Sequence, residues 1–141
     1  MRILVGLLLV IHGLITVAQA GGGFKPSQAV PNPSWLSWWP SSLGQSWLLA
    51  RLGLERSVLG SLAGVLWLFA GACLVAAALG LFGFAVPTTW WRILAGAGAL
   101  LSLVLFIVYA HPLYAIGIGA NLAILLVLLW AKWPPVQVLG S

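Results

Sequence analysis

The side chain with the widest range of chemistry in this sequence is His12, because it lies inside a long apolar run. Thr16 and Gln19 follow it four and seven residues later, so on a helix all three side chains share one face. A histidine in that position could be the axial ligand of a haem or chlorophyll, or a hydrogen-bond donor to a quinone carbonyl. It could equally be a neutral histidine that is bonded to a neighbouring helix.

Most other chemistries lack the residues that they need. Glu55 is the single acidic residue, so no carboxylate pair can carry out general acid–base catalysis. Metalloprotease, phosphate-loop and dinucleotide motifs are absent from the sequence, and the single Cys73 supports neither a disulfide nor a cysteine metal site. His12 and His111 differ in expected depth by roughly 13 Å, too far for both to ligate one iron. We therefore predict a protein that is not catalytic on its own.

The composition identifies lipid as the main solvent. Of the 141 residues, 62% are hydrophobic and 5% are charged, whereas soluble domains carry roughly 25% charged residues. Six scattered cations give a net charge of +5, and their scatter argues against a nucleic-acid-binding face. The sequence therefore predicts a single membrane domain over residues 1–141.

Four apolar segments have the length of a bilayer-spanning helix, which needs about 20 residues. Helices are favoured because open strand edges leave backbone groups unsatisfied in lipid. We predict an all-α fold, a bundle of four transmembrane helices over residues 3–20, 57–82, 90–110 and 113–131. The first segment also resembles a secretory signal, with Ala18-Gln19-Ala20 as its cleavage site. We predict that it is an uncleaved helix.

Residues 21–56 are predicted to form one long Pro- and Trp-rich loop. The glycines at 21–23 are expected to end the first helix, and residues 45–54 to form a short interfacial helix. Trp38 and Trp39 belong to a tryptophan cluster that is typical of the membrane–water interface. The cations are evenly divided between the two sides, so the signal-like start decides the orientation. Both termini are expected in the cytoplasm and the loop outside.

The polar residues of the four segments fall in one half of the membrane when the helices alternate in direction. That half adjoins the long loop, and the other half is apolar. Because polar groups in a bilayer face the bundle interior or water, two interpretations remain. The groups are either hydrogen bonds between helices or an outward-opening ligand pocket. The candidate pocket residues are His12, Thr16, Ser61, Tyr109 and Asn121, with Trp38 and Trp39 as a lid.

The start of the chain, with Arg2, Gly6, His12 and Gly13 in an apolar run, resembles DoxX-like membrane proteins. The glycine-punctuated second segment is similar to the second helix of that family. The resemblance implies a four-helix bundle in a bacterial plasma membrane, and some family members are subunits of thiosulfate:quinone oxidoreductases. Thr16 lies near the position where many members carry a lysine, and the long loop is unusual. Catalytic roles are therefore not transferred.

Two functions are compatible with these features. We predict an accessory subunit of an electron-transfer or quinone-linked complex in the bacterial inner membrane, packed against other membrane subunits or copies of itself. The alternative is a binding module for a quinone, lipid or pigment in the polar half of the bundle. The sequence requires no particular cofactor; a quinone, haem or chlorophyll would fit, and His12 is the candidate axial ligand of the last two.

Overall fold

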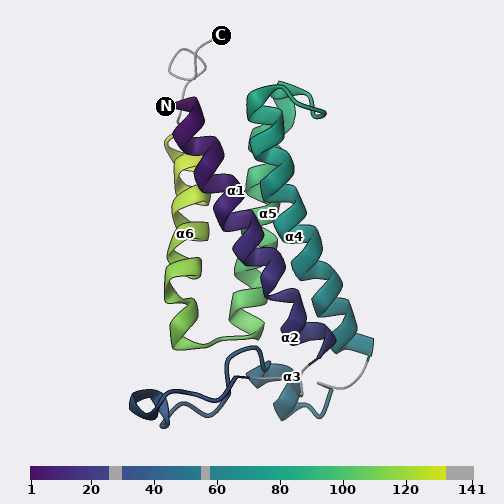
Figure 1. The fold of residues 1–141 in the computed structure, drawn as a ribbon, viewed down its shortest axis with the longest axis vertical. Helices are drawn as coiled ribbons and strands as arrows, with labels where there is room; N and C mark the ends of the chain where they lie inside the picture. The colour runs from purple at the N-terminus through teal and green to yellow at the C-terminus, as the bar shows by residue number, and fades with distance from the viewer. Residues whose placement is uncertain (26–29, 55–57, 133–141) are drawn as a thin grey trace.

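A computed structural model describes residues 1–25, 30–54 and 58–132, and its regular elements are helices apart from one isolated β-bridge between Val30 and Leu43 (Figure 1). Four helical stretches are long and apolar enough to cross a membrane: Arg2–Phe24, Val58–Phe82, Thr88–Val108 and Pro112–Trp130. The predicted all-helical architecture is confirmed, and four helices long and apolar enough to span a membrane suggest a multi-pass membrane protein.

The four spans are built from named elements. The first contains α1 (Arg2–Ala18) and α2 (Ala20–Phe24), and the second is α4 (Val58–Phe82). The third begins with the 3-10 turn η3 (Thr88–Trp90) and continues as α5 (Trp91–Val108). The fourth consists of η4 (Pro112–Tyr114), α6 (Ala115–Leu125) and a π-helical turn, η5 (Leu126–Trp130). Between the first two spans lie η2 (Ser34–Leu36) and α3 (Trp47–Arg51).

One sequence expectation was wrong: the three glycines at 21–23 do not end the first helix. They lie within α2, which continues the first span as far as Phe24. A Cβ atom added at Gly23 would collide with the backbone of Gly64 on α4, and one added at Gly22 would collide with Gly44. The glycines are therefore needed for close approach of backbones rather than for chain reversal. The predicted loop is correspondingly shorter, and residues 55–57 at its end lie outside the described residues.

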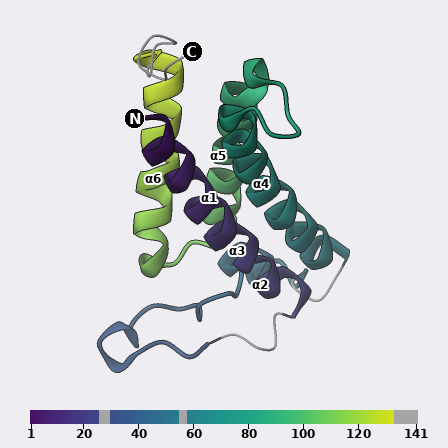
Figure 2. The same cartoon turned by 45° about the horizontal axis from the view of Figure 1, so that its top comes forward.

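Helix α4 is the centre of the bundle, because it packs against α1, α2 and α5, whereas α6 packs mainly on α5 (Figures 1 and 2). Half of the α4 span is buried, compared with 17% of the fourth span. Small residues make this central packing possible. A Cβ on Gly13 would lie 2.9 Å from the carbonyl oxygen of Gly71, and one on Gly98 would lie 2.8 Å from that of Ala70.

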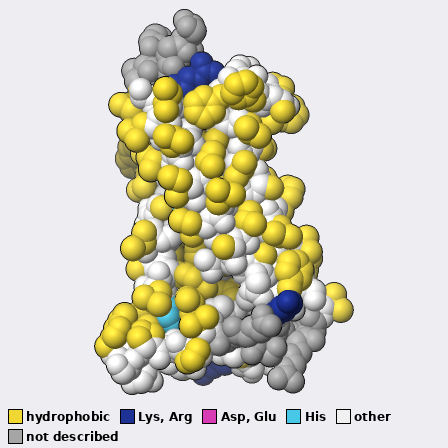
Figure 3. Space-filling view, viewed as in Figure 1, with side chains coloured by type: hydrophobic (Ala, Val, Ile, Leu, Met, Phe, Trp, Pro, Cys, Tyr) yellow, Lys and Arg dark blue, Asp and Glu magenta, His cyan; other side chains and the backbone are white. Residues whose placement is uncertain are grey.

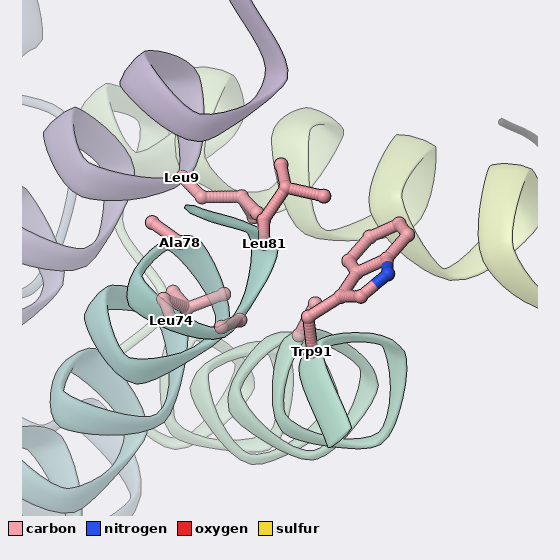
Figure 4. Close-up of a cluster of buried hydrophobic side chains, with 7 residues drawn as sticks. Leu9, Leu74, Ala78, Leu81 and Trp91 are labelled. Carbon is pink, nitrogen blue, oxygen red and sulfur yellow. The ribbon is translucent and has the colours of Figure 1, made fainter. Parts of the chain in front are cut away.

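The bundle has two ends, which we call the loop end and the terminal end. The loop end carries η2 and α3, and the terminal end carries the start of α1 and the end of η5 (Figure 1). An apolar cluster toward the terminal end joins Leu9, Leu74, Leu81 and Trp91 (Figure 4). Toward the loop end, a second cluster is rich in aromatic residues and is centred on the fully buried Trp67.

The flank of the bundle is apolar, as a surface in contact with lipid should be. Hydrophobic side chains cover the visible flank, and the cationic side chains lie toward its two ends (Figure 3). Exposed tryptophans mark both ends: Trp35 and Trp38 at the loop end, and Trp90 and Trp130 at the terminal end. This distribution matches the aromatic belts of membrane proteins.

Candidate functional site

A hydrogen bond between His12 on α1 and Asn121 on α6 joins two helices that otherwise pack on different neighbours. Nε2 of His12 lies 2.9 Å from Oδ1 of Asn121, although the residues are 109 positions apart in the chain. With the amide in this orientation its oxygen accepts, so His12 donates and carries its proton on Nε2. Asn121 is fully buried, and His12 is partly exposed.

The amide of Asn121 is only half satisfied. Its Nδ2 is buried and has no hydrogen-bond partner. Turning the amide over would put the oxygen in that place, so one end of the group stays unpaired in either orientation. A buried polar group without a partner costs roughly 1–3 kcal/mol. The described residues contain one other such group, Nε1 of Trp67 on α4. Buried donors of this kind mark places where a polar partner is expected.

An apolar groove of about 420 Å³ runs between α1 and α6, beside this pair. It extends from Val5 and Val127, toward the terminal end, to His12 and Ala120. His12 supplies the only polar side chain among the lining residues. The groove is open to the side, since its wall residues Leu8 and Ile11 are both more than half exposed. Its volume falls in the range of roughly 300–1,000 Å³ that small-molecule sites occupy.

The groove lies in the half of the bundle where α1 runs beside α6. From its contact with α6 near the terminal end, α1 inclines toward α4, so that the first span ends beside α4 at the loop end (Figures 1 and 2). Small residues on the α6 side, Ala120 and Ala123, leave the space unfilled.

The groove differs from the pocket that the sequence suggested. We expected a polar pocket opening toward the loop, whereas the groove lies on the other side of His12 and is apolar. Two buried hydroxyls of the spans, on Thr16 and Ser102, explain part of the difference. Thr16 donates to the carbonyl of His12 at 2.8 Å, and Ser102 donates to the carbonyl of Ala99 at 3.2 Å. Both hydroxyls are fully buried and bonded within their own helices.

The remaining predicted site residues are not gathered around His12. Ser61 is exposed on α4. Tyr109 is buried and lies edge-on to Trp67, with 6.1 Å between ring centroids. The structure therefore brings together His12, Thr16 and Asn121, and it places these two residues elsewhere.

The two tryptophans proposed as a lid also have other neighbours. Trp39 lies edge-on to His111, with 6.4 Å between centroids, and Trp38 packs edge-on against Trp39 at 5.5 Å. His111 precedes Asn121 by ten residues, which places it roughly 15 Å away along the fourth span. These rings therefore cover the connection between α5 and α6 rather than the groove.

His111 is held at this connection in one protonation state. Its Nδ1 accepts from the backbone N–H of Leu113 at 3.2 Å, and its Nε2 lies 2.9 Å from Oδ1 of Asn32. The first contact needs an unprotonated Nδ1 and the second needs Nε2–H, so the ring is neutral. Its side chain is 3% exposed, and this burial lowers the pKa of His111. Its pairing with Asn32 could not be predicted from the sequence, because their proximity depends on how the loop folds back.

The loop is also fastened to the end of α5. The hydroxyl of Ser46 donates to the carbonyl of Val108 at 2.8 Å, and Nε1 of Trp47 donates to the carbonyl of Ile107 at 2.7 Å. These carbonyls belong to the last turn of α5, where the regular helical hydrogen bonds end, and that of Ile107 also accepts from the backbone N–H of Ala110 at 3.3 Å. The same Ser46 hydroxyl accepts from the backbone N–H of Leu49 and so caps α3. Ser46 and Trp47 of the loop thus supply hydrogen-bond donors to two carbonyls at the end of α5.

No protein-family model, curated protein or solved structure matched this chain. Across residues 1–25, 30–54 and 58–132, no group of three or more His, Cys, Asp or Glu residues could hold a metal ion. The candidate site therefore rests on the geometry of the groove and of the His12–Asn121 pair.

Proposed function

We propose that this protein is a membrane module that binds an apolar molecule carrying a hydrogen-bond acceptor, of the quinone or lipid class, in the groove between α1 and α6. The observation that carries the proposal is the amide of Asn121. It is fully buried, bonded to His12 at one end and unpaired at the other, and His12 lines an apolar groove.

The polar contact decides which molecule binds at such a site. A ligand that arrives from the bilayer already lies among apolar chains, so filling the groove alone gains little over lipid. Asn121 lies behind His12 and does not itself line the groove, so a carbonyl oxygen would have to pass beyond His12 to take its Nδ2 donor, which would remove a cost of roughly 1–3 kcal/mol. His12 would hold the other end of the amide and keep its orientation. In this arrangement the apolar part of the ligand would lie toward Val5 and Val127, and the carbonyl group of the ligand would lie beside His12.

A quinone or lipid is favoured over a haem or chlorophyll. Axial ligation uses a ring nitrogen of histidine as the ligand to the metal. Nε2 of His12 is engaged with Asn121 at 2.9 Å, so ligation through it would break this bond and leave the whole amide unpaired. A carbonyl ligand keeps the bond and adds the missing one.

The setting that we propose is the plasma membrane of a bacterium, with both termini in the cytoplasm and the loop outside. The signal-like first segment and the DoxX-like pattern of Arg2, Gly6, His12 and Gly13 support it. The module would serve as an accessory subunit of a quinone-linked complex, in which it holds the apolar ligand close to a catalytic partner. The fourth span, only 17% buried, offers the largest surface for partner helices.

The test is to purify the full chain in a gentle detergent and identify the co-extracted apolar molecules by mass spectrometry. We expect one molecular class to be enriched over the bulk membrane extract. The N121L variant removes the amide with little change in volume, and the A123F variant fills the groove; both should lose the ligand. L122F is the matched control, because Leu122 is the exposed neighbour of Ala123 and does not line the groove. Equal retention by N121L and A123F would refute the proposal.

A further inference from the structure

A second pocket, of about 510 Å³, lies on the loop rather than in the membrane span. Ser41, Gln45, Ser46, Trp47 and Arg51 are among the residues that line it. It therefore joins the segment before α3 to the last turn of α3, where Arg51 lies. The groove between α1 and α6 shares none of these residues.

Two polar side chains of this pocket, Gln45 and Ser41, have hydrogen-bond donors that remain available. Oε1 of Gln45 accepts from the backbone N–H of Ser42 at 3.4 Å, which leaves its Nε2 group to donate. The Ser41 hydroxyl accepts from Nε1 of Trp39 at 3.1 Å, which leaves its O–H to donate. Ser41 is only 7% exposed, so its hydroxyl belongs to the pocket rather than to the open surface.

Arg51 adds a positive charge, and no acidic side chain accompanies it within residues 1–25, 30–54 and 58–132. Glu55 is the one acidic residue of the sequence, and it lies outside the described residues. Within the described part of the chain, Arg51 therefore has no acidic side chain to pair with. A guanidinium with amide and hydroxyl donors around one cavity is the arrangement that binds tetrahedral oxyanions.

The pocket is held in place by the bundle. Ser46 and Trp47, which form part of its wall, donate to the carbonyls of Val108 and Ile107 on α5. A wall fixed in this way reduces the ordering that binding would otherwise require. Trp47 also suits the membrane–water interface, the depth at which lipid phosphates are found.

From these contacts we infer that the pocket of Ser41, Gln45 and Arg51 binds a phosphate-bearing anion, such as the headgroup of an anionic phospholipid or a soluble phosphate ester. The inference is independent of the groove and of the proposed function. It gives the loop a binding role at the surface of the membrane.

The experiment is a titration of the full chain in detergent, with native mass spectrometry counting the bound molecules. The two probes are phosphatidylglycerol and glycerol phosphate. We expect R51Q to weaken binding at least about tenfold, as the loss of a charge-assisted hydrogen bond predicts. Q45E should weaken it similarly, because its carboxylate can still accept from Ser42 while repelling the anion. K25Q is the control for charge, since Lys25 is exposed and lines a different pocket.

The outcomes are distinct. Binding of both probes that is lost in R51Q and Q45E shows that the phosphate group alone is recognised. Loss confined to phosphatidylglycerol shows that the lipid headgroup at the membrane is the ligand. Equal weakening by K25Q and R51Q would overturn the inference, because it would mean that net charge and not this pocket attracts the anion. Unchanged binding by Q45E would also overturn it, because the anion would then bind away from Gln45.

Discussion

Replacing His12 should destabilise the bundle, and replacing Asn121 as well should restore most of the loss. In H12L the amide of Asn121 loses its only partner and stays fully buried with both ends unpaired. The interhelical bond is worth about 0.6–2 kcal/mol, and the newly unpaired acceptor adds roughly 1 kcal/mol or more. We therefore expect H12L to lower the free energy of unfolding by about 2–3 kcal/mol.

The double variant H12L/N121L removes both polar groups at nearly constant volume. Because nothing polar is then left unpaired at this position, its stability should return to within about 0.5 kcal/mol of the unmodified chain. With N121L alone near neutral, the coupling energy between the two sites would be about 2 kcal/mol, within the range for residues in contact. The expected stability of the double variant and the coupling energy follow from the same observation, that His12 is the one hydrogen-bond partner recorded for the Asn121 amide.

The assay is reversible unfolding in mixed detergent micelles, followed by circular dichroism, for the four members of the cycle. H12L combined with L122A serves as the additive control, because Leu122 is exposed and takes no part in the His12–Asn121 hydrogen bond. A coupling energy below about 0.3 kcal/mol would refute the reasoning. It would mean that the unfolded state in the micelle satisfies the amide as well as His12 does.

Three further perturbations test other parts of the fold. G23A should cost about 1–3 kcal/mol in thermal unfolding, because its Cβ would meet the backbone of α4, whereas G21A, with open space around it, should be nearly neutral. S46A should cost about 1–3 kcal/mol in the same measurement and should speed proteolysis of the loop, since the Val108 carbonyl loses its donor. Burial lowers the pKa of His111, so the unfolded chain binds this proton more readily and the free energy of unfolding should fall as the pH drops below about 6.5. H111N keeps an acceptor for the cap and should abolish that pH dependence; an unchanged profile would contradict the assignment of a neutral ring.

The spans could be predicted from the sequence because each depends on a sum over about 20 residues. Single errors in a boundary hardly change that sum. The exception was the end of the first span, where Gly21 to Gly23 look like a break in the chain. Glycine ends a helix in water, but it also allows two backbones to touch, and which applies depends on what lies opposite. Gly64 on α4 lies opposite Gly23, and the sequence does not show that.

The candidate site was predictable in part, for a related reason. The position of His12 in an apolar run, on one face with Thr16, follows from helical periodicity alone. Its bond to Asn121 does not, because it depends on the angle between α1 and α6. Ser61 is the opposite case, since we expected it inside the bundle and it is exposed on α4. Periodicity relates residues within one helix, but it does not give the rotation of that helix toward its neighbours.

The groove and the His12–Asn121 bond have a common origin in the bilayer. In water, an apolar gap between α1 and α6 would tend to close, because closing it would remove apolar surface from water. In lipid the tails are as apolar as the walls, so little free energy favours closure and the gap can persist. A hydrogen bond still stabilises the contact between two helices in lipid, so the His12–Asn121 pair can hold α1 and α6 together beside an open groove. An apolar ligand would then enter and leave at little net gain, and Asn121 would determine which ligand stays.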